Sequence, residues 1–95
     1  MLEEIYALKI GNQDFYPHFR EGWTIYLQKG VEPSEFKDED FVIYCQEDGK
    51  GVLRQISMEG SKQVILKALC RGEENQVIPR DRLKLCDKVI NIRLN

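Results

Sequence analysis

The sequence has few of the residues from which disulfide frameworks and metal centres are built. Three cysteines and one histidine occur among its 95 residues. Cys45, Cys70 and Cys86 are far apart, odd in number and without a Cys-x-x-Cys pair, so they predict neither a disulfide framework nor a zinc site. We expect no metal and no other cofactor, and a reducing cytoplasm is the compartment that fits best.

Long apolar runs and an excess of positive charge are absent as well. No stretch approaches the roughly 20 apolar residues of a membrane-spanning helix, and the first four residues lack the cationic start and apolar core of a signal peptide. Sixteen acidic residues stand against 14 basic ones, with a pI near 5.4. The composition therefore predicts a cytoplasmic protein that contacts neither membrane nor DNA directly.

The length limits how much surface the chain can bury. Ninety-five residues make a single domain, residues 1–95, which buries roughly 60 to 65% of the surface of its unfolded chain. A second chain packed against such a small domain would add useful stability. We therefore expect self-association, as a homodimer.

Short runs of β-branched and aromatic residues, separated by turn residues, fill most of the chain. The Asp48-Gly49 turn between two such runs predicts a β-hairpin. Residues 80–86 fit either a strand or a single helical turn, and the charged residues 28–40 predict a long exposed connection that adds little to the core. The predicted strands are 5–10, 23–27, 41–45, 52–56, 63–69, 76–79 and 89–94.

This pattern predicts an all-β fold. Seven or eight short strands joined by turns form either a small sandwich or a partly closed barrel. No internal repeat, low-complexity tract or long helical pattern occurs in the sequence.

Residues 10–22 leave one predicted strand and enter the next, and they carry the most distinctive spacing in the chain. Pro17, Phe19 and Gly22 stand at the intervals of a proline, an apolar residue and a glycine before a hydrophobic strand. In this spacing the segment resembles the nucleophile loop of the LexA and phage-repressor family of self-cleaving serine–lysine peptidases. The order of the later hairpin and the final strand resembles that family too, with Asn91 in place of a glycine near the end.

The resemblance fixes which residue stands at the position of the nucleophile. Counting back from Pro17 places Asp14 where the family has its serine. Gly11 lies one residue further upstream than the family's glycine, and counting from it places Gln13 there instead. Neither side chain offers a hydroxyl group.

The residue that activates the nucleophile is replaced as well. In the family, a lysine on the second strand of the hairpin accepts the proton of the serine, which burial makes possible for a lysine. Here Arg54 best fills that position, and a shift of one residue would place Leu53 there. An arginine side chain keeps its proton and cannot act as a general base.

A fold that once held a serine and a lysine in contact would bring their replacements close together. We therefore predict that Asp14 and Arg54 pair or share a hydrogen-bond network. The alternative is that both side chains point into solvent, where an exposed pair contributes only about 0 to 1 kcal/mol and need not form.

The resemblance implies an oligomerisation and regulatory domain of a LexA-like or phage-repressor-like transcriptional regulator, here without catalytic activity. It also implies that DNA is read by an N-terminal helix-turn-helix domain, which is missing from this chain. For the dimer contact we predict the C-terminal strand, because an exposed edge of apolar residues invites pairing. The predicted contact residues are Val89, Ile90, Ile92 and Leu94.

Two other functions stay open from the sequence alone. The first is an active self-cleaving peptidase that uses another serine or Asp14, although aspartic proteases need two carboxylates in one site. The second is a small β-barrel that binds a peptide, since the acidic composition argues against nucleic acid.

The remaining polar and aromatic residues predict structural roles. His18 has no second histidine or nearby cysteine, so we expect it to be solvated rather than to bind a metal. Serines 34, 57 and 61 lie in predicted turns. An aromatic cluster is expected mainly to build the core, with a peptide groove as the alternative. Its members are Tyr16, Phe19, Trp23 and Tyr26.

Overall fold

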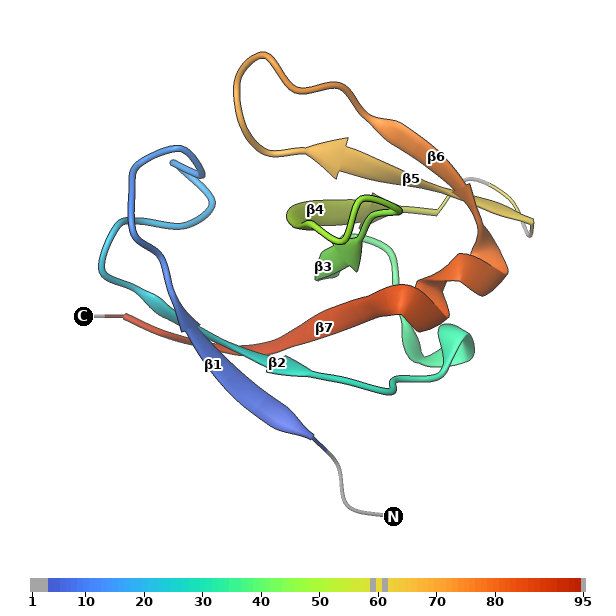
Figure 1. The fold of residues 1–95 in the computed structure, drawn as a ribbon, viewed down its shortest axis with the longest axis horizontal. Coiled ribbons are helices and arrows are strands. Elements are labelled where there is room, and N and C mark those ends of the chain that lie inside the picture. Colours follow the sequence, from blue (N-terminus) through green and yellow to red (C-terminus); the bar gives the residue numbers. More distant parts are fainter. Residues whose placement is uncertain (1–3, 59, 61, 95) are drawn as a thin grey trace.

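The computed structural model, which describes residues 4–58, 60 and 62–94, consists of one curled antiparallel sheet of seven strands (Figure 1). Their order in the sheet is β1-β2-β7-β3-β4-β5-β6. The end strands β1 and β6 do not pair with each other, so the sheet does not close into a barrel. The strands are β1 (Ile5–Lys9), β2 (Thr24–Gln28), β3 (Phe41–Cys45), β4 (Gly51–Ser57), β5 (Gln63–Ala68), β6 (Gln76–Pro79) and β7 (Cys86–Arg93).

The predicted all-β fold is thus confirmed, with helical structure limited to two short 3-10 helices in the described residues. These are η1 (Pro33–Glu35) and η2 (Arg80–Leu85). The second of them decides the ambiguous segment in favour of helical turns, which Pro79 precedes and the buried Leu83 anchors. No helix within the described ranges is long and apolar enough to cross a bilayer.

The hairpin of β3 and β4 forms where the Asp48-Gly49 turn predicts it. The Asp48 carboxylate accepts a hydrogen bond from the backbone N–H of Lys50 at 2.9 Å, and Gly49 has a φ of 85°. Gly51 lies at a close approach of the two strands, where a Cβ would be 2.9 Å from Ile43 Cγ2 and the Ile43 side chain would have to shift. Local turn chemistry and close strand packing therefore set the register of this hairpin.

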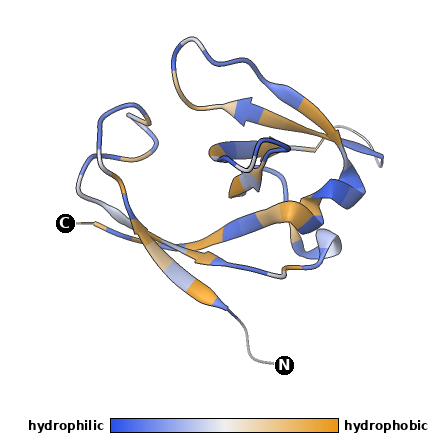
Figure 2. Ribbon diagram, in the orientation of Figure 1, coloured by the Kyte–Doolittle hydropathy of each residue, from blue (hydrophilic) through white to orange (hydrophobic). Residues whose placement is uncertain are grey.

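Apolar side chains on the concave face form two buried clusters, and Figure 2 shows apolar residues recurring along the strands. The larger cluster contains residues of the four strands β3, β4, β5 and β6, of η2 and of the start of β7. The smaller one joins β1 and β2 with the loop between them, and Leu53 on β4. Its buried members are Ile10, Phe19, Ile25, Leu27 and Leu53.

The prediction that residues 28–40 add little to the core is wrong. Val31 and Phe36 are only 4% and 2% exposed and belong to the larger cluster. They flank η1, whose short helical turn holds both side chains against the sheet. The charged residues around them dominate the composition of the connection, so the sequence pattern does not indicate that its two apolar residues are buried.

The dimer prediction assumed that the C-terminal strand lies at an edge of the sheet. This assumption is wrong. β7 runs between β2 and β3, and pairs with β3 through residues 86–88 and with β2 through residues 88–93. Beyond Lys88 no described strand pairs with the side of β7 that faces β3, and Val89, Ile90 and Ile92 line a groove of about 390 Å³ there. Ile90 and Leu94 are 41% and 65% exposed. The predicted contact residues are thus partly accessible, but on an interior strand.

Cys86 gives the stability of this fold a dependence on pH. Its side chain is 1% exposed, and burial, followed by the charge of Asp87, raises the pKa of its thiol to about 12. In an unfolded chain a cysteine thiol has a pKa of about 8.5. Between that pH and the pKa of about 12, the folded state binds more protons than the unfolded state. The free energy of unfolding therefore falls as the pH rises through this window.

We expect Cys86→Val to remove this contribution, because valine fills a similar apolar space without a titrating group. Urea denaturation at about pH 8 and about pH 10 should show a smaller loss of stability in Cys86→Val than in the wild type, by up to about 1.4 kcal/mol per pH unit. The exposed Cys45 offers the control Cys45→Ser, which should keep the wild-type loss. Equal losses in all three proteins would contradict this role of Cys86.

Candidate functional site

The loop between β1 and β2 is closed at its base by backbone hydrogen bonds. The Ile10 N–H donates to the Trp23 carbonyl at 2.8 Å, and the Gly22 N–H donates to the Ile10 carbonyl at 2.8 Å. Gly22 has a φ of 92°, a backbone conformation that favours glycine. The segment that carries the spacing of Pro17, Phe19 and Gly22 before β2 is therefore a loop that is closed at its base.

Phe19 anchors this loop to the sheet. Its side chain is fully buried, and its ring meets that of Phe41 edge-on, with 4.8 Å between the centroids. Pro17 lies at the turn before it, after a cis peptide bond. A Cβ added at Gly11 would meet no described atom within 4 Å, so packing does not require a glycine there. Of the loop motif, Phe19 and Gly22 thus have clear structural roles.

Asp14 lies in the tip of the loop, with its carboxylate exposed. Its backbone N–H donates to the Asn12 side-chain oxygen at 3.0 Å, which makes a local turn. The carboxylate forms no ion pair with any residue in the described part of the chain. It lines a pocket of about 770 Å³ between this loop and the connection from β5 to β6.

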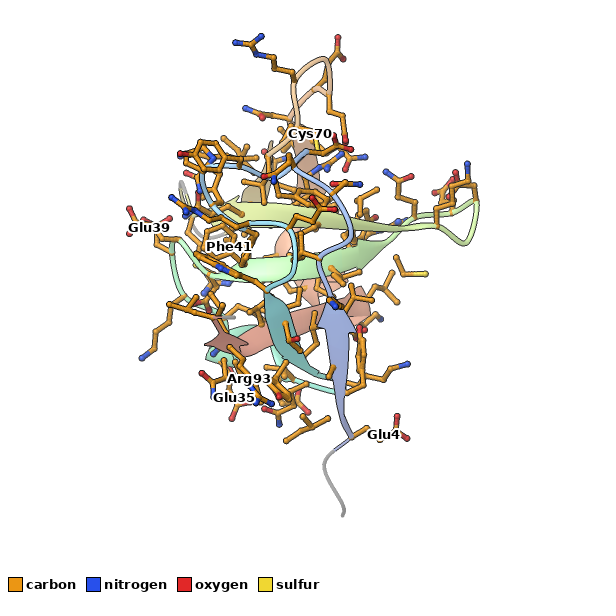
Figure 3. All side chains as sticks on the ribbon, turned by 90° about the vertical axis from the view of Figure 1, so that its left-hand side faces the viewer. Glu4, Glu35, Glu39, Phe41, Cys70 and Arg93 are labelled. Atoms are coloured by element: carbon orange, nitrogen blue, oxygen red, sulfur yellow. The ribbon has the colours of Figure 1, made fainter. Side chains whose placement is uncertain are left out.

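That pocket is built from two loops that face each other at one end of the curled sheet. Figure 3 shows Cys70 at this end, above Phe41, where the β5–β6 connection meets the β1–β2 loop. The lining combines carboxylates, a thiol and a guanidinium with one apolar and one aromatic side chain. The lining residues are Gln13, Asp14, Tyr16, Leu69, Cys70, Arg71 and Glu73.

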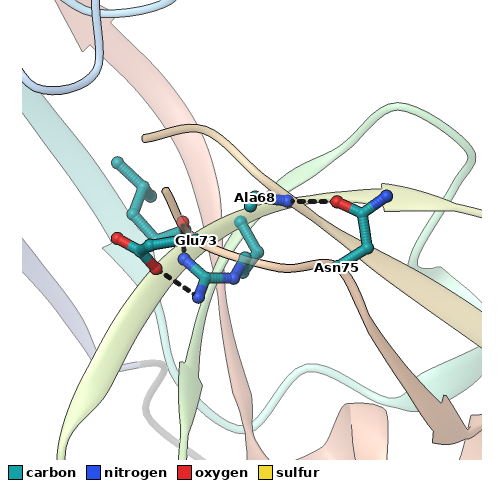
Figure 4. A network of polar contacts seen from close by, with 5 residues as sticks. Ala68, Glu73 and Asn75 are labelled. Atoms are coloured by element: carbon teal, nitrogen blue, oxygen red, sulfur yellow. Dashed lines mark hydrogen bonds and ion pairs between the residues drawn. The ribbon is translucent and has the colours of Figure 1, made fainter. Parts of the chain in front are cut away.

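Arg54 is the one buried charged residue among those described, at 4% exposure, and it pairs with Glu73 of this pocket. Its Nη2 donates to the Glu73 carboxylate at 2.5 Å, and its Nη1 donates to the Leu53 carbonyl at 3.1 Å (Figure 4). Its Nε is buried without a hydrogen-bond partner among the residues that the structure describes. Glu73, whose side chain is 40% exposed, therefore provides the negative charge that compensates the desolvated guanidinium of Arg54.

The structure pairs Arg54 with Glu73 and leaves the Asp14 carboxylate outside the ion pairs of the described residues, so the predicted pairing of Asp14 with Arg54 is wrong. Both Asp14 and Arg54 act electrostatically on the same thiol, that of Cys70. The sequence places Glu73 in a turn, Arg71-Gly72-Glu73, and gives no direct sign of its role. The available signal is indirect, because an arginine on an apolar strand needs a carboxylate from elsewhere in the chain.

Cys70 is held in its protonated form by this arrangement. Burial raises the pKa of its thiol, the hydrogen bond to Glu73 and the charges of Glu73 and Asp14 raise it further, and Arg54 opposes them. The thiolate is the nucleophilic form of cysteine. A raised pKa therefore makes Cys70 a poor nucleophile at neutral pH.

Of the aromatic and histidine residues considered in the sequence, some pack against the core and others lie at the surface. Tyr16 is 55% exposed and lies under the Arg20 guanidinium at 5.5 Å, so the prediction that the aromatic cluster builds the core fails for this member. Trp23 packs partly buried against the smaller cluster. His18 is exposed, and its ring and that of Phe41 meet edge-on, with 5.7 Å between the centroids.

Comparison with known proteins adds no family to this description. No protein-family model matches the sequence, and no curated protein matches it either.

Proposed function

We propose that this chain is a non-catalytic oligomerisation and regulatory domain of a transcriptional regulator resembling LexA and the phage repressors. The resemblance of residues 10–22, the hairpin and the final strand supports this proposal, as does the curled antiparallel sheet on which they lie. DNA would be read by a separate domain of the regulator. This domain would set how many such DNA-reading heads act together.

The observation that carries the proposal is the state of Arg54. In a serine–lysine peptidase, this position has to supply a group that accepts a proton from the nucleophile. Here a buried guanidinium occupies it, and two of its three nitrogens donate to Glu73 and to the Leu53 carbonyl. A group that keeps its proton and is fixed as an ion-pair partner offers no basic lone pair. Arg54 therefore cannot serve as the base for Asp14 at the nucleophile position.

The regulatory effect of such a domain comes from effective concentration. When two domains associate, the DNA-reading heads attached to them are tethered, and binding of one head to half of an operator promotes binding of the other. No residue of this domain has to touch a base, which agrees with the acidic composition.

Incubation of the protein at alkaline pH, followed by mass measurement, tests the absence of catalysis. We expect the intact mass to persist at about pH 10, a pH at which a buried lysine base would be fully deprotonated. Asp14→Ala is the matched variant, and it should behave like the wild type. A specific cut in the wild type that is lost in Asp14→Ala would replace the proposal with an unusual self-cleaving peptidase.

A further inference from the structure

We infer that the open edge of β1 is a self-pairing surface, through which two copies of this chain join their sheets antiparallel. This inference rests on the proposed function, because it names the surface for the proposed self-association. It places that surface on β1 and not on the C-terminal strand.

The backbone groups along β1 are available in a regular row. The Lys29 N–H donates to the Glu4 carbonyl and the Ile10 N–H donates to the Trp23 carbonyl, so the even-numbered residues face β2. By the alternation of antiparallel pairing, Ile5, Ala7 and Lys9 point their N–H and C=O groups away from β2. β1 is the terminal strand of the sheet, and no other described strand pairs with that side.

Natural edge strands are usually protected against pairing, and β1 shows little of this protection. Prolines, bulges and several charges are the common devices. The pairing of β1 with β2 is regular over residues 5–9, and Lys9 is the one charged residue of the strand. Ile5 and Leu8 are 52% and 43% exposed, one on each face of the strand. The opposite edge strand, β6, is shorter and ends at Pro79.

The sequence of β1 is complementary to a second copy of itself. A two-fold axis at Ala7 places the smallest side chain opposite its copy, Ile5 opposite Lys9, and Tyr6 opposite Leu8. The outward-facing residues then exchange about six hydrogen bonds in the antiparallel pattern. Like charges do not stand opposite each other, and the exposed Ile5 can cover the aliphatic part of the Lys9 side chain of the second copy.

The open part of β7 is less suited to pairing with a copy of itself. Its register with β2 shifts between Tyr26 and Leu27, so the strand is irregular there. Glu39, which is in none of the ion pairs of the described residues, lines the same groove, and a two-fold axis there would bring the Glu39 carboxylates of both copies into one interface. Repulsion between these like charges disfavours a symmetric contact at that place.

Charge changes at Ile5 test the inference with opposite signs. Sedimentation equilibrium of the full chain measures the dimer dissociation constant. Ile5→Glu places a carboxylate opposite Lys9 of the second copy and should lower this constant about two- to tenfold, while Ile5→Lys should raise it by a similar factor. Because Ile5 is more than half exposed, neither change removes core packing.

Ala7→Pro tests the hydrogen bonds. It removes an outward-facing N–H while leaving the bonds from β1 to β2 in place, and should raise the dissociation constant at least about tenfold. Circular dichroism checks that each variant keeps the fold. Ile90→Glu serves as the control on β7, and should leave the constant unchanged.

The outcomes separate this inference from the proposed function. A wild-type dimer that responds to Ile5 and Ala7 as stated supports both. If the dissociation constant does not respond to these changes and the dimer is lost in Ile90→Glu, the β1 surface is overturned while the proposed self-association stands. A wild-type chain that stays monomeric at the highest attainable concentration overturns the proposed self-association, and the β1 surface with it.

Discussion

Glu73→Gln should destabilise the fold by about 3 kcal/mol. Removing one partner of a buried ion pair leaves the other charge uncompensated, at a typical cost of about 3 to 5 kcal/mol. Here the side chain of Arg54 is 5% exposed and its Nε already lacks a partner within the described part of the chain. The expected value lies at the lower end because Glu73 is 40% exposed and water can take part of its place. Urea denaturation near neutral pH measures the change.

Glu74→Gln is the matched control for this prediction. Glu74 is the next residue in the same connection, exposed and outside the ion pairs of the described residues. Its change should alter stability by no more than about 0.5 kcal/mol. Equal effects of the two substitutions would show that Glu73 does not compensate a buried charge.

Removing the guanidinium as well distinguishes the energy of the ion pair from other effects of changing the loop that carries Glu73. Arg54→Met replaces the buried charge with an apolar side chain of similar length, and such replacements are often neutral or stabilising. In that background Glu73→Gln should cost far less than in the wild type. The difference between the two costs is the coupling energy of the pair. A coupling near zero would mean that the buried charge is balanced in another way.

The hairpin of β3 and β4 shows which parts of this fold can be predicted from sequence. Its strands are rich in β-branched and aromatic residues and its turn contains Asp48 and Gly49, so neighbouring residues carry the whole signal. Val31 and Phe36 show the opposite case. Each is a single apolar residue in a charged stretch without periodicity, and only the packing of η1 against the sheet reveals its burial.

Strand order and ion-pair choice lie beyond local pattern for a similar reason. β7 resembles a closing edge strand because it comes last in the chain, yet it is inserted between β2 and β3. Arg54 and Glu73 are 19 residues apart, and the intervening β5 brings the connection that carries Glu73 back over β4. The resemblance predicts that Asp14 and Arg54 lie close together, but no pattern in the sequence names Glu73 as the partner of the arginine.

Phe19→Ala should destabilise the protein by about 3 to 5 kcal/mol, the usual cost of truncating a buried aromatic residue. The Phe19 side chain is fully buried, contacts the Phe41 ring and belongs to the smaller cluster together with Leu53, the neighbour of Arg54. Its loss therefore leaves a cavity between the loop that carries Asp14 and the strand that carries Arg54. Thermal or urea denaturation measures the effect.

Tyr16→Ala provides the comparison within the same loop. Tyr16 is 55% exposed, and its contact with the Arg20 guanidinium is worth only about 0.5 to 1 kcal/mol at an exposed site. A substitution there should cost less than about 1 kcal/mol. Phe19→Leu should lie between the two, because leucine fills part of the cavity. If Phe19→Ala costs no more than Tyr16→Ala, the loop is not anchored by Phe19, and the position of Asp14 in the pocket that it lines together with Glu73 must depend on contacts other than this one.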